Sequence, residues 1–297
     1  MSDTQRCAYV AIVGRPNVGK STILNYCVGQ KISITSRKPQ TTRFQVRGIY
    51  TNGSNQLIFV DTPGWQQRPQ KRLNRLMNKE IDHALAAVDI VVLVAEARRW
   101  LPEDESIAKL AAKASCPSVL VLNKHDQLSK KQELLPTMAK LNSQQVFTEI
   151  LPTNATSGDN IQTLLQTLID LAPQAPHVYS EDEITDKPVR FLVAELLREK
   201  LMRSLGDELP YAISVVIDKY EEQENIDFID ASIWIERAGQ KGIVIGKQGA
   251  RLKSIASAAR KDMESLLGKK VHLETWVKLR ANWSDDQLAL SELDFDS

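Results

Sequence analysis

Residues 14–21 have the sequence Gly-Arg-Pro-Asn-Val-Gly-Lys-Ser, which fits the pattern G-x-x-x-x-G-K-[ST]. The apolar run Ala8–Val13 precedes this stretch and predicts a buried strand, and Lys20–Val28 follows it and predicts a helix. Glycines let successive backbone N–H groups wrap around an anion, and the positive end of a helix dipole adds to the attraction. A glycine-rich turn can match the pattern by chance, but the strand before it and the helix after it favour a phosphate-binding loop.

The phosphate-loop pattern predicts a chemical role for two of its side chains. Lys20 can reach the β- and γ-phosphates of a nucleoside triphosphate, which makes it a candidate catalytic residue, and the Ser21 hydroxyl can ligate Mg²⁺. The residues of this stretch that we expect to bind the nucleotide are Gly14, Asn17, Val18, Gly19, Lys20, Ser21 and Thr22.

Further apolar runs follow the loop in the first half of the chain. Gln56–Val60, Asp89–Ala95 and Ser118–Leu122 predict strands. Leu73–Val88 and Ser106–Ala114 lie between them and predict helices. Strands that alternate with helices form a mostly parallel sheet covered on both faces, with ligands at the carboxyl ends of the strands. The predicted fold class of this half is therefore α/β.

The tetrapeptide Asp61-Thr62-Pro63-Gly64 follows one of these predicted strands. Asp61 would hold Mg²⁺, and the Gly64 N–H would meet the γ-phosphate, which makes Gly64 a second candidate catalytic residue. Alone, such a D-x-x-G sequence is usually a turn. Its place after a strand of the same domain favours the metal site.

A second polar tetrapeptide, Asn123-Lys124-His125-Asp126, leaves the strand at residues 118–122. The Asp126 carboxylate can accept hydrogen bonds from N1 and N2 of guanine, whereas adenine has no such donor pair and would leave the carboxylate unpaired. Asn123, Lys124 and Asp126 therefore predict binding of GTP and GDP, and hydrolysis of GTP rather than ATP. A solvated polar loop is the alternative for the tetrapeptide taken alone.

Length and composition bound the class of protein. The 297 residues suit two domains, and a hydrophobic fraction of 42% lets each bury a core. The 38 basic and 37 acidic residues nearly cancel, and the three cysteines lack metal-ligand or disulfide spacing, which is typical of reduced thiols. With no signal-peptide pattern and no apolar run near the roughly 18 residues that span a bilayer, we expect a cytoplasmic protein. Peripheral attachment at the inner face of the cell membrane stays open.

The alternation of strands and helices stops after Leu171. Residues 172–188 hold three prolines and several acidic residues without periodicity, and so predict a linker. We predict a first domain over residues 1–171, this linker, a second domain over residues 189–283 and an acidic tail over residues 284–297. The tail carries five acidic residues and no basic one, and we expect it to be mobile.

The second domain has a different order of elements. Helix, strand and strand are predicted over residues 189–202, 211–220 and 229–235, and a helix and a strand follow over residues 252–266 and 271–279. Gly246-Lys247-Gln248-Gly249 lies between these two groups. A G-x-x-G loop in this order predicts an α+β type II KH module, whose loop clamps about four single-stranded nucleotides.

The charge of this region sharpens the prediction. Residues 237–280 hold eleven basic side chains against three acidic ones. A charge excess is more often a solvated face, but beside a G-x-x-G loop it favours contact with RNA phosphates over a merely structural loop. Ile243 and Ile245 would floor the groove for the bases. The predicted RNA-binding residues are Lys241, Ile243, Ile245, Gly246, Lys247, Gln248, Gly249, Arg251 and Lys253.

Together these motifs resemble the Era family of bacterial ribosome-assembly GTPases over nearly the whole chain. Residues 31–43 are similar to that family's first switch, and residues 198–203, 208–211 and 260–263 match it in the second half. The resemblance implies a monomeric, Mg²⁺-dependent GTPase that binds the 3′ end of 16S rRNA and the 30S ribosomal subunit during assembly. We further hypothesise that GTP, by ordering the loops Lys38–Arg43 and Asp61–Trp65, couples the nucleotide state to RNA binding.

The same resemblance implies roles for further residues of the first domain. Thr42 would contact Mg²⁺ together with Ser21 and Asp61, and would take part in catalysis. Asn17, with Thr41, either helps to bind a K⁺ ion or, as the plainer alternative, shapes the loop.

Two positions depart from related GTPases. Trp65 stands where Ras-like enzymes carry a glutamine that orients the attacking water, so hydrolysis should be slow or use a water placed by other groups. Asn154-Ala155 stands where the family has Ser-Ala. The Ala155 N–H could still meet guanine O6, and Asn154 can form a local hydrogen bond as serine would.

Three classes of function compete. The first is a regulatory GTPase whose nucleotide state gates RNA or ribosome binding. The second is a GTP-dependent RNA-modifying enzyme, which needs a metal cluster, a catalytic cysteine or a cofactor motif that the sequence does not show. The third is a stress or membrane-associated regulator whose RNA contact is incidental.

Overall fold

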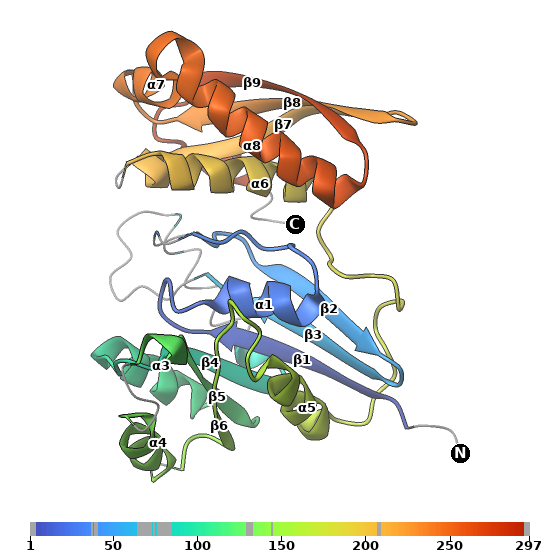
Figure 1. Cartoon of the computed structure of the whole chain (residues 1–297), viewed down its shortest axis with the longest axis vertical. Coiled ribbons are helices and arrows are strands. Elements are labelled where there is room, and N and C mark those ends of the chain that lie inside the picture. The colour runs from blue at the N-terminus through green and yellow to red at the C-terminus, as the bar shows by residue number, and fades with distance from the viewer. Residues whose placement is uncertain are drawn as a thin grey trace. The chain divides into compact units, whose positions relative to one another are not determined.

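The computed structural model describes residues 4–36, 38, 41–63, 73, 75, 85–128, 133–143, 145–206 and 209–293. The chain forms two compact units (Figure 1). The first comprises Met1–Ser33, Thr42–Pro69 and Asn74–Asp186, and the second comprises Ile34–Thr41, Gln70–Leu73 and Lys187–Ser297. This division is not a single cut in the sequence, because the short segment Ile34–Thr41 groups with the second unit. None of the described helices combines the length and apolarity that crossing a lipid bilayer requires.

The first unit contains, within the described residues, a six-stranded sheet of order β2-β3-β1-β4-β5-β6. Its strands are β1 (Arg6–Val13), β2 (Val46–Asn52), β3 (Asn55–Asp61), β4 (Ile90–Glu96), β5 (Ser118–Asn123) and β6 (Glu149–Pro152). Only β2 and β3 pair antiparallel in this sheet, and the other neighbours pair parallel. The predicted mostly parallel α/β domain is therefore confirmed.

Helices cover this sheet. α1 (Lys20–Val28) and α5 (Ile161–Leu171) lie side by side and contact β3 (Figure 1). α3 (Pro102–Ala111) and α4 (Leu134–Asn142) pack into an apolar cluster with alternate residues of β1, β4 and β5. Because alternate residues of a strand point to opposite faces, each strand contributes to the core on both sides. The predicted helix over Leu73–Val88 lies mostly outside the described residues.

The predicted linker follows the first unit up to Asp186. Gln56 on β3 is fully buried, and its Oε1 accepts hydrogen bonds from the N–H groups of Val178 at 2.8 Å and Tyr179 at 3.0 Å. Its Nε2 donates to the carbonyl oxygen of Tyr179 at 2.9 Å. Arg47 donates to the Tyr179 hydroxyl at 3.4 Å and pairs with Asp186 at 3.8 Å. Residues 172–186 are therefore held as a strap on this unit.

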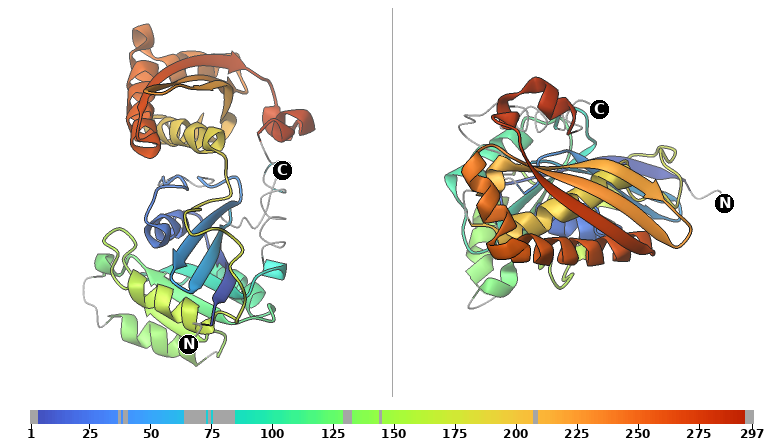
Figure 2. Two further views of the ribbon diagram at one scale, coloured as in Figure 1. Left: turned by 90° about the vertical axis from the view of Figure 1, so that its right-hand side faces the viewer. Right: turned by 90° about the horizontal axis from the view of Figure 1, so that it is seen from above.

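The second unit contains, among the described residues, a three-stranded sheet of order β7-β8-β9. Its strands are β7 (Ile213–Glu222), β8 (Ile226–Ile235) and β9 (Lys270–Leu279), with β7 antiparallel and β9 parallel to β8. Helices α6 (Val189–Ser204) and α8 (Ala250–Leu267) cover one face of this sheet (Figure 2). The predicted α+β fold is confirmed, and a short helix that we did not predict, α7 (Ala238–Ile245), precedes the glycine loop.

The prediction of a mobile tail is wrong for residues 284–293. Trp283 is fully buried, and the short helix α9 (Gln287–Ser291) follows it. Leu290 and Leu293 are only 2% and 6% exposed. The segment is ordered because these apolar side chains are removed from water, which the acidic composition of the segment concealed.

Candidate functional site

The phosphate loop joins β1 to α1 with a backbone that requires glycine. Gly14 has a φ of 151°, and a Cβ atom at this position would lie 2.3 Å from the carbonyl oxygen of Val94. The Lys20 side chain is buried, and its Nζ donates to the carbonyl oxygens of Gly14 and Arg15, both at 3.0 Å. Burial lowers the pKa of Lys20 to about 8, and a phosphate beside Nζ would favour the charged form again.

Three hydroxyl groups surround the carboxylate of Asp61, which ends β3. Asp61 Oδ2 accepts from Ser33 Oγ at 2.8 Å, from Ser21 Oγ at 2.9 Å and from Thr42 Oγ1 at 3.4 Å. The hydroxyl oxygens of Ser21 and Thr42 lie 2.9 Å apart. Burial raises the pKa of Asp61, against the charge of Lys20 and these hydrogen bonds.

This cluster fits a magnesium ion. Within the part of the chain that the structure describes, Asp61 Oδ1 is buried and has no hydrogen-bond donor. A hard divalent cation prefers oxygen ligands, and one beside Asp61 would satisfy this atom and stabilise the charged carboxylate. Ser21, Thr42 and Asp61, the three residues predicted to bind Mg²⁺, therefore meet in one place. Ser33, which we did not predict, joins them.

The predicted guanine motif is tied to the phosphate loop by its first two residues. Asn123, at the end of β5, donates from Nδ2 to the carbonyl oxygen of Val18 at 2.8 Å. Lys124 has a positive φ of 62°, and its Nζ donates to the carbonyl oxygen of Asn17 at 2.6 Å and to Glu96 Oε1 at 2.6 Å. These contacts bring loops from β1, β4 and β5 together at the carboxyl edge of the sheet.

Glu96 is a residue that the sequence reasoning missed. Burial raises its pKa, but the hydrogen bond and charge of Lys124 outweigh burial, so the pKa of Glu96 lies below its usual value. Glu96 ends β4 and pairs in register with Asn123 of β5. The rule that site residues follow strand ends could have found it.

The remaining guanine-motif residues lie on neighbouring loops. Asp126 is exposed in the short 3₁₀ helix η1 (His125–Gln127). Asn154 Oδ1 accepts from the Thr156 N–H at 3.0 Å, a local bond of the kind expected of serine. The Ala155 N–H donates to Asn123 Oδ1 at 3.0 Å, so the predicted contact with guanine O6 would share this donor.

An open pocket of about 490 Å³ lies between α1 and the loop that carries Ala155. Thr22 and Ala155, both predicted to bind nucleotide, contribute to its wall together with Tyr26 and Lys31. Its volume is within the range of small-ligand pockets, and it adjoins the first turn of the helix that follows the phosphate loop. Thr22 and Ala155, 133 positions apart in the sequence, thus line one pocket.

Some predicted residues lie outside the part of the chain that the structure describes, and others fall in different units. Gly64 and Trp65 lie outside the described residues, as do Arg37, Pro39 and Gln40 of the first switch. Thr41 groups with the second unit, whereas Asn17 belongs to the first. The described residues contain no group of three or more His, Cys, Asp or Glu side chains placed to hold a metal ion.

The predicted RNA loop lies between α7 and α8. Gly246 has a φ of 73°, and a Cβ atom there would lie 2.6 Å from the Cβ of Arg251. Gln248 also has a positive φ, of 50°. Lys247 and Gln248 are exposed, so the tip of the loop is accessible to a polynucleotide backbone.

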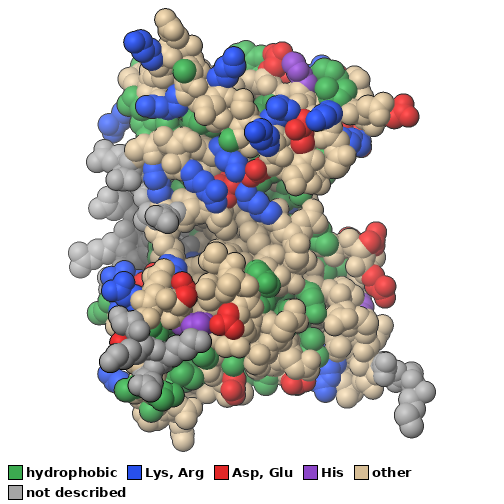
Figure 3. Space-filling view, in the orientation of Figure 1, with side chains coloured by type: hydrophobic (Ala, Val, Ile, Leu, Met, Phe, Trp, Pro, Cys, Tyr) green, Lys and Arg blue, Asp and Glu red, His purple; other side chains and the backbone are tan. Residues whose placement is uncertain are grey.

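Basic side chains surround this loop. Lys241, Lys247, Arg251 and Lys253 are all exposed, and Figure 3 shows lysine and arginine side chains over α7 and the start of α8. On α7, Ile243 is 46% exposed, while Val244 is fully buried in the core of the second unit. Ile243 is thus available to a ligand, and Ile245 is half-buried.

Comparison with known proteins covers both units. A family model described as a 50S ribosome-binding GTPase matches residues 9–124, and a KH domain model matches residues 208–284. The GTPase Era of Pseudomonas aeruginosa is 48% identical over 98% of this chain and 95% of its own length. The GTPase Era of Ectopseudomonas mendocina is 49% identical over 98% of this chain and 97% of its own length.

Two solved structures are similar over the whole chain. One is Era in complex with MgGDPNP and nucleotides 1506–1542 of 16S ribosomal RNA, with a TM-score of 0.94 and 35% identity over 98% of this chain and 99% of that one. The other is a variant of Aquifex aeolicus Era bound to GDP·AlF4⁻, with a TM-score of 0.93 and 35% identity over the same shares. The similarity therefore extends over both units and is not confined to the phosphate loop.

Proposed function

This chain belongs to the Era family of GTPases, and from that membership we propose that it hydrolyses GTP with Mg²⁺ and binds the 3′ end of 16S rRNA during assembly of the 30S ribosomal subunit. Lys20, Ser21 and Asp61 carry the first part of this proposal, because they converge at the phosphate loop with Thr42 beside them. The G-x-x-G loop and its exposed basic side chains support the second part.

The residues of the first unit suggest how the triphosphate is held. When bound, Mg²⁺ supplies positive charge that neutralises the β- and γ-phosphates. Ser21, Thr42 and Asp61 would hold this ion. Lys20 Nζ can exchange its two backbone carbonyl partners for phosphate oxygens, and the loop N–H groups can donate to the same phosphates.

Lys20, Thr42 and Gly64 would act on the γ-phosphoryl group, by stabilising its charge and by positioning the metal and a backbone N–H. The Trp65 side chain has no carbonyl or carboxylate to orient an attacking water, so we propose a slow intrinsic rate. Single-turnover hydrolysis by the full chain tests this point, and a fast rate without any added partner would contradict it.

Base selectivity tests the nucleotide site most directly. Calorimetric titration with GTP, ATP and GDP in the presence of Mg²⁺ should show tight binding of both guanine nucleotides and at least about 100-fold weaker binding of ATP, since the Asp126 carboxylate would lose its two donors. Equal affinity for ATP and GTP, or no binding of either, would overturn the proposal.

A monovalent cation is a finer part of the same proposal. We propose that Asn17, with Thr41, helps to bind K⁺, which would supply a positive charge to the phosphates. Hydrolysis should then be faster in KCl than in NaCl at equal ionic strength, and Asn17→Ala should remove the difference. If Asn17 only shapes the loop, the two salts will give the same rate in the unchanged protein.

If the RNA proposal is right, RNA binding depends on the sequence of the RNA and on which guanine nucleotide the protein holds. An oligonucleotide with the 3′-terminal sequence of 16S rRNA should bind more tightly than one of scrambled sequence, and RNA crosslinked to the protein in cells should map to that end. Co-sedimentation with 30S subunits should differ between GDP and a non-hydrolysable GTP analogue. Equal RNA affinity in the two nucleotide states would contradict the proposed coupling.

The remaining partner and location proposals follow from this function. We propose that the protein acts as a monomer in the cytoplasm, with peripheral contact at the inner face of the cell membrane. Light scattering at assay concentration tests the monomer. Flotation with vesicles of anionic lipid tests the membrane contact, and a protein that stays entirely with the soluble fraction would contradict it.

A further inference from the structure

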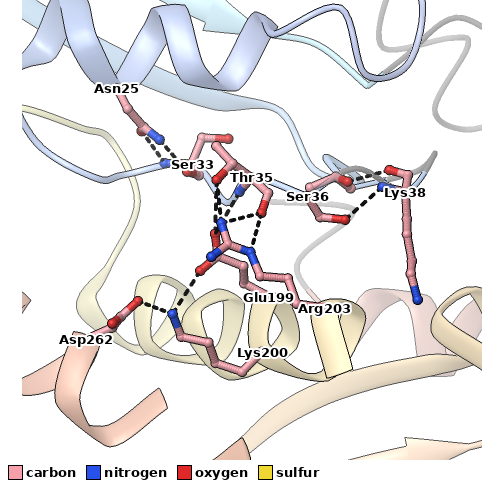
Figure 4. A network of polar contacts seen from close by, with 10 residues as sticks. Asn25, Ser33, Thr35, Ser36, Lys38, Glu199, Lys200, Arg203 and Asp262 are labelled. Carbon is pink, nitrogen blue, oxygen red and sulfur yellow. Dashed lines mark hydrogen bonds and ion pairs between the residues drawn. The ribbon is translucent and has the colours of Figure 1, made fainter. Parts of the chain in front are cut away.

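A single carboxylate of the second unit binds the switch segment, which we define as residues 34–41. Glu199 Oε1 on α6 accepts hydrogen bonds from the Thr35 N–H at 3.0 Å and from Thr35 Oγ1 at 3.2 Å (Figure 4). Arg203 contacts both of these residues, so that Thr35, Glu199 and Arg203 form a ring of hydrogen bonds. Its guanidinium donates to Thr35 Oγ1 at 2.8 Å, to the Thr35 carbonyl oxygen at 2.9 Å and to Glu199 Oε1 at 2.9 Å.

Two further contacts hold Thr41 and Lys38, which are described residues of the switch segment. Arg198, which is only 1% exposed and is paired with Glu195 at 2.6 Å, donates to the carbonyl oxygen of Thr41. Lys38 Nζ donates to the carbonyl oxygen of Gly206 at 3.1 Å. The residues at both ends and in the middle of the segment are therefore held by the C-terminal half of α6 and the turn that follows it.

Burial of the Glu199 carboxylate strengthens its preference for the contact with Thr35. The Glu199 side chain is 0% exposed, and its Oε2 lies 3.4 Å from Lys200 Nζ, which also contacts Asp262 on α8. A buried carboxylate without partners is costly, so the ring with Thr35 is strongly favoured over a free segment. The sequence pattern that resembles the family at residues 198–203 thus contains three side chains that bind the switch segment.

The switch segment is joined at both ends to the predicted magnesium site. Ser33 precedes it, and its Oγ donates to Asp61 Oδ2 at 2.8 Å. Thr42 follows it, and its Oγ1 lies 3.4 Å from the same oxygen and 2.9 Å from Ser21 Oγ. One peptide bond separates Thr42 from Thr41, so whatever fixes the Thr41 backbone limits where the Thr42 hydroxyl can lie.

We propose that Glu199 is a positioning residue for GTP hydrolysis, acting through Thr35 and the switch segment on Thr42. This role presupposes the GTPase function proposed above. A segment that is already held presents Thr42 to Mg²⁺ and the γ-phosphate without a further ordering cost. GDP has no γ-phosphate and does not need Thr42. Glu199 therefore favours the GTP state over the GDP state, and it makes the second unit part of the nucleotide response.

The test compares two nucleotides in the full-length protein. Affinities for GDPNP and GDP with Mg²⁺ are measured for Glu199→Ala, together with kcat and KM for GTP. Coupling of this kind is commonly worth about tenfold, so GDPNP should bind about tenfold more weakly while GDP stays within about twofold. The kcat value should also fall, because Thr42 is presented less often.

A second variant keeps the test valid if Glu199→Ala misfolds. Thr35→Val has nearly the same shape, keeps the backbone N–H bond to Glu199 and removes only the hydroxyl contacts. It should shift the ratio of GDPNP to GDP affinity in the same direction, by about threefold, and it decides the matter if Glu199→Ala does not fold.

Glu264→Ala is the matched control. Glu264 on α8 also pairs with an arginine of its own helix, Arg260, at 2.7 Å, and accepts from the Val271 N–H at 3.3 Å, but it does not contact the switch segment in the described structure. It should lower thermal stability and leave the nucleotide ratio unchanged. A ratio unchanged in both test variants, or shifted equally in Glu264→Ala, would overturn the role of Glu199. If the wild-type protein binds ATP as tightly as it binds GTP, the proposed GTPase function itself is wrong.

Discussion

The side-chain amide of Asn123 donates a hydrogen bond of 2.8 Å to the carbonyl oxygen of Val18, 105 positions earlier in the sequence. Its carbonyl oxygen accepts from the Ala155 N–H at 3.0 Å. One buried amide therefore joins the phosphate loop, the guanine motif and the loop after β6. The relative placement of these loops is fixed by protein groups alone, which reduces the entropy that a nucleotide must overcome on binding.

Replacing Lys20 with alanine should abolish tight nucleotide binding. The variant loses the charge-assisted hydrogen bonds to the phosphates, and we expect GTP and GDP to bind at least about 100-fold more weakly in calorimetry. Lys113→Ala removes an exposed lysine of the same unit and should leave both affinities unchanged. Retained nucleotide affinity in Lys20→Ala would contradict the assignment of the phosphate loop.

Replacing Asp126 with asparagine should change the preferred base. The amide can accept from guanine N1 but presents its NH2 group to the N2 donor, whereas it can donate to the 2-carbonyl of xanthine, so GTP affinity should fall about 100-fold and xanthosine triphosphate should bind better than GTP. Competition between the two nucleotides for the same fluorescent analogue measures this directly. A uniform loss for both nucleotides would indicate that Asp126 supports the loop instead of reading the base.

Replacing Gly249 with aspartate should weaken RNA binding without affecting GTP hydrolysis. A Cβ atom at this position would meet no atom within 4 Å, but the φ of 77° strains any side chain there, so strain and the added negative charge act together, and we expect about tenfold weaker binding of the oligonucleotide. Gly268→Asp provides a close control, because Gly268 also has a positive φ, 68° against 77°, and open space around it.

Equal losses in Gly249→Asp and Gly268→Asp would show that backbone strain or overall charge causes the effect. A loss in the first variant alone would assign RNA contact to the glycine loop. Multiple-turnover GTPase assays without RNA check that the first unit is intact in both variants.

Replacing Trp283 with alanine should destabilise the second unit. Trp283 is fully buried, and its Nε1 donates to the carbonyl oxygen of Ala212 at 3.1 Å, so truncation should lower the free energy of unfolding by about 3–5 kcal/mol. Urea unfolding followed by circular dichroism measures it. Trp276→Ala, which truncates a tryptophan that is 43% exposed on the same unit, should cost much less. Equal costs would mean that burial of Trp283 and its hydrogen bond to Ala212 do not stabilise the second unit.

Local motifs made the nucleotide site predictable from the sequence. The phosphate loop, Asp61 and Asn123 each follow a strand in the sequence, and parallel strands bring their carboxyl ends to one edge. The amino-acid order alone was therefore enough to place Lys20, Ser21 and Asp61 together. The fold of the second unit was also predictable, because the G-x-x-G loop at Gly246 and the helices and strands around it each have a local sequence pattern.

The features that escaped prediction depend on contacts between distant segments. No local pattern indicates that Thr35 pairs with Glu199, or that Gln56 binds residues 172–186. Helix α7 was missed because its glycines and its β-branched residues at 243–245 disfavour a helix. The tail was misjudged because its acidic composition outweighed one signal that was present, the apolar spacing of Trp283, Leu290 and Leu293.

The strap held by Gln56 decides how this chain can be divided for separate expression. A fragment that stops at Leu171, where the alternation of elements ends in the sequence, would remove three hydrogen bonds from the Gln56 side chain, which is 0% exposed, and would keep its contacts with Thr51 and Cys7. Extending the fragment to Asp186 keeps those bonds and the pairing with Arg47. The compact first unit thus reaches about fifteen residues beyond α5, and a fragment should include them.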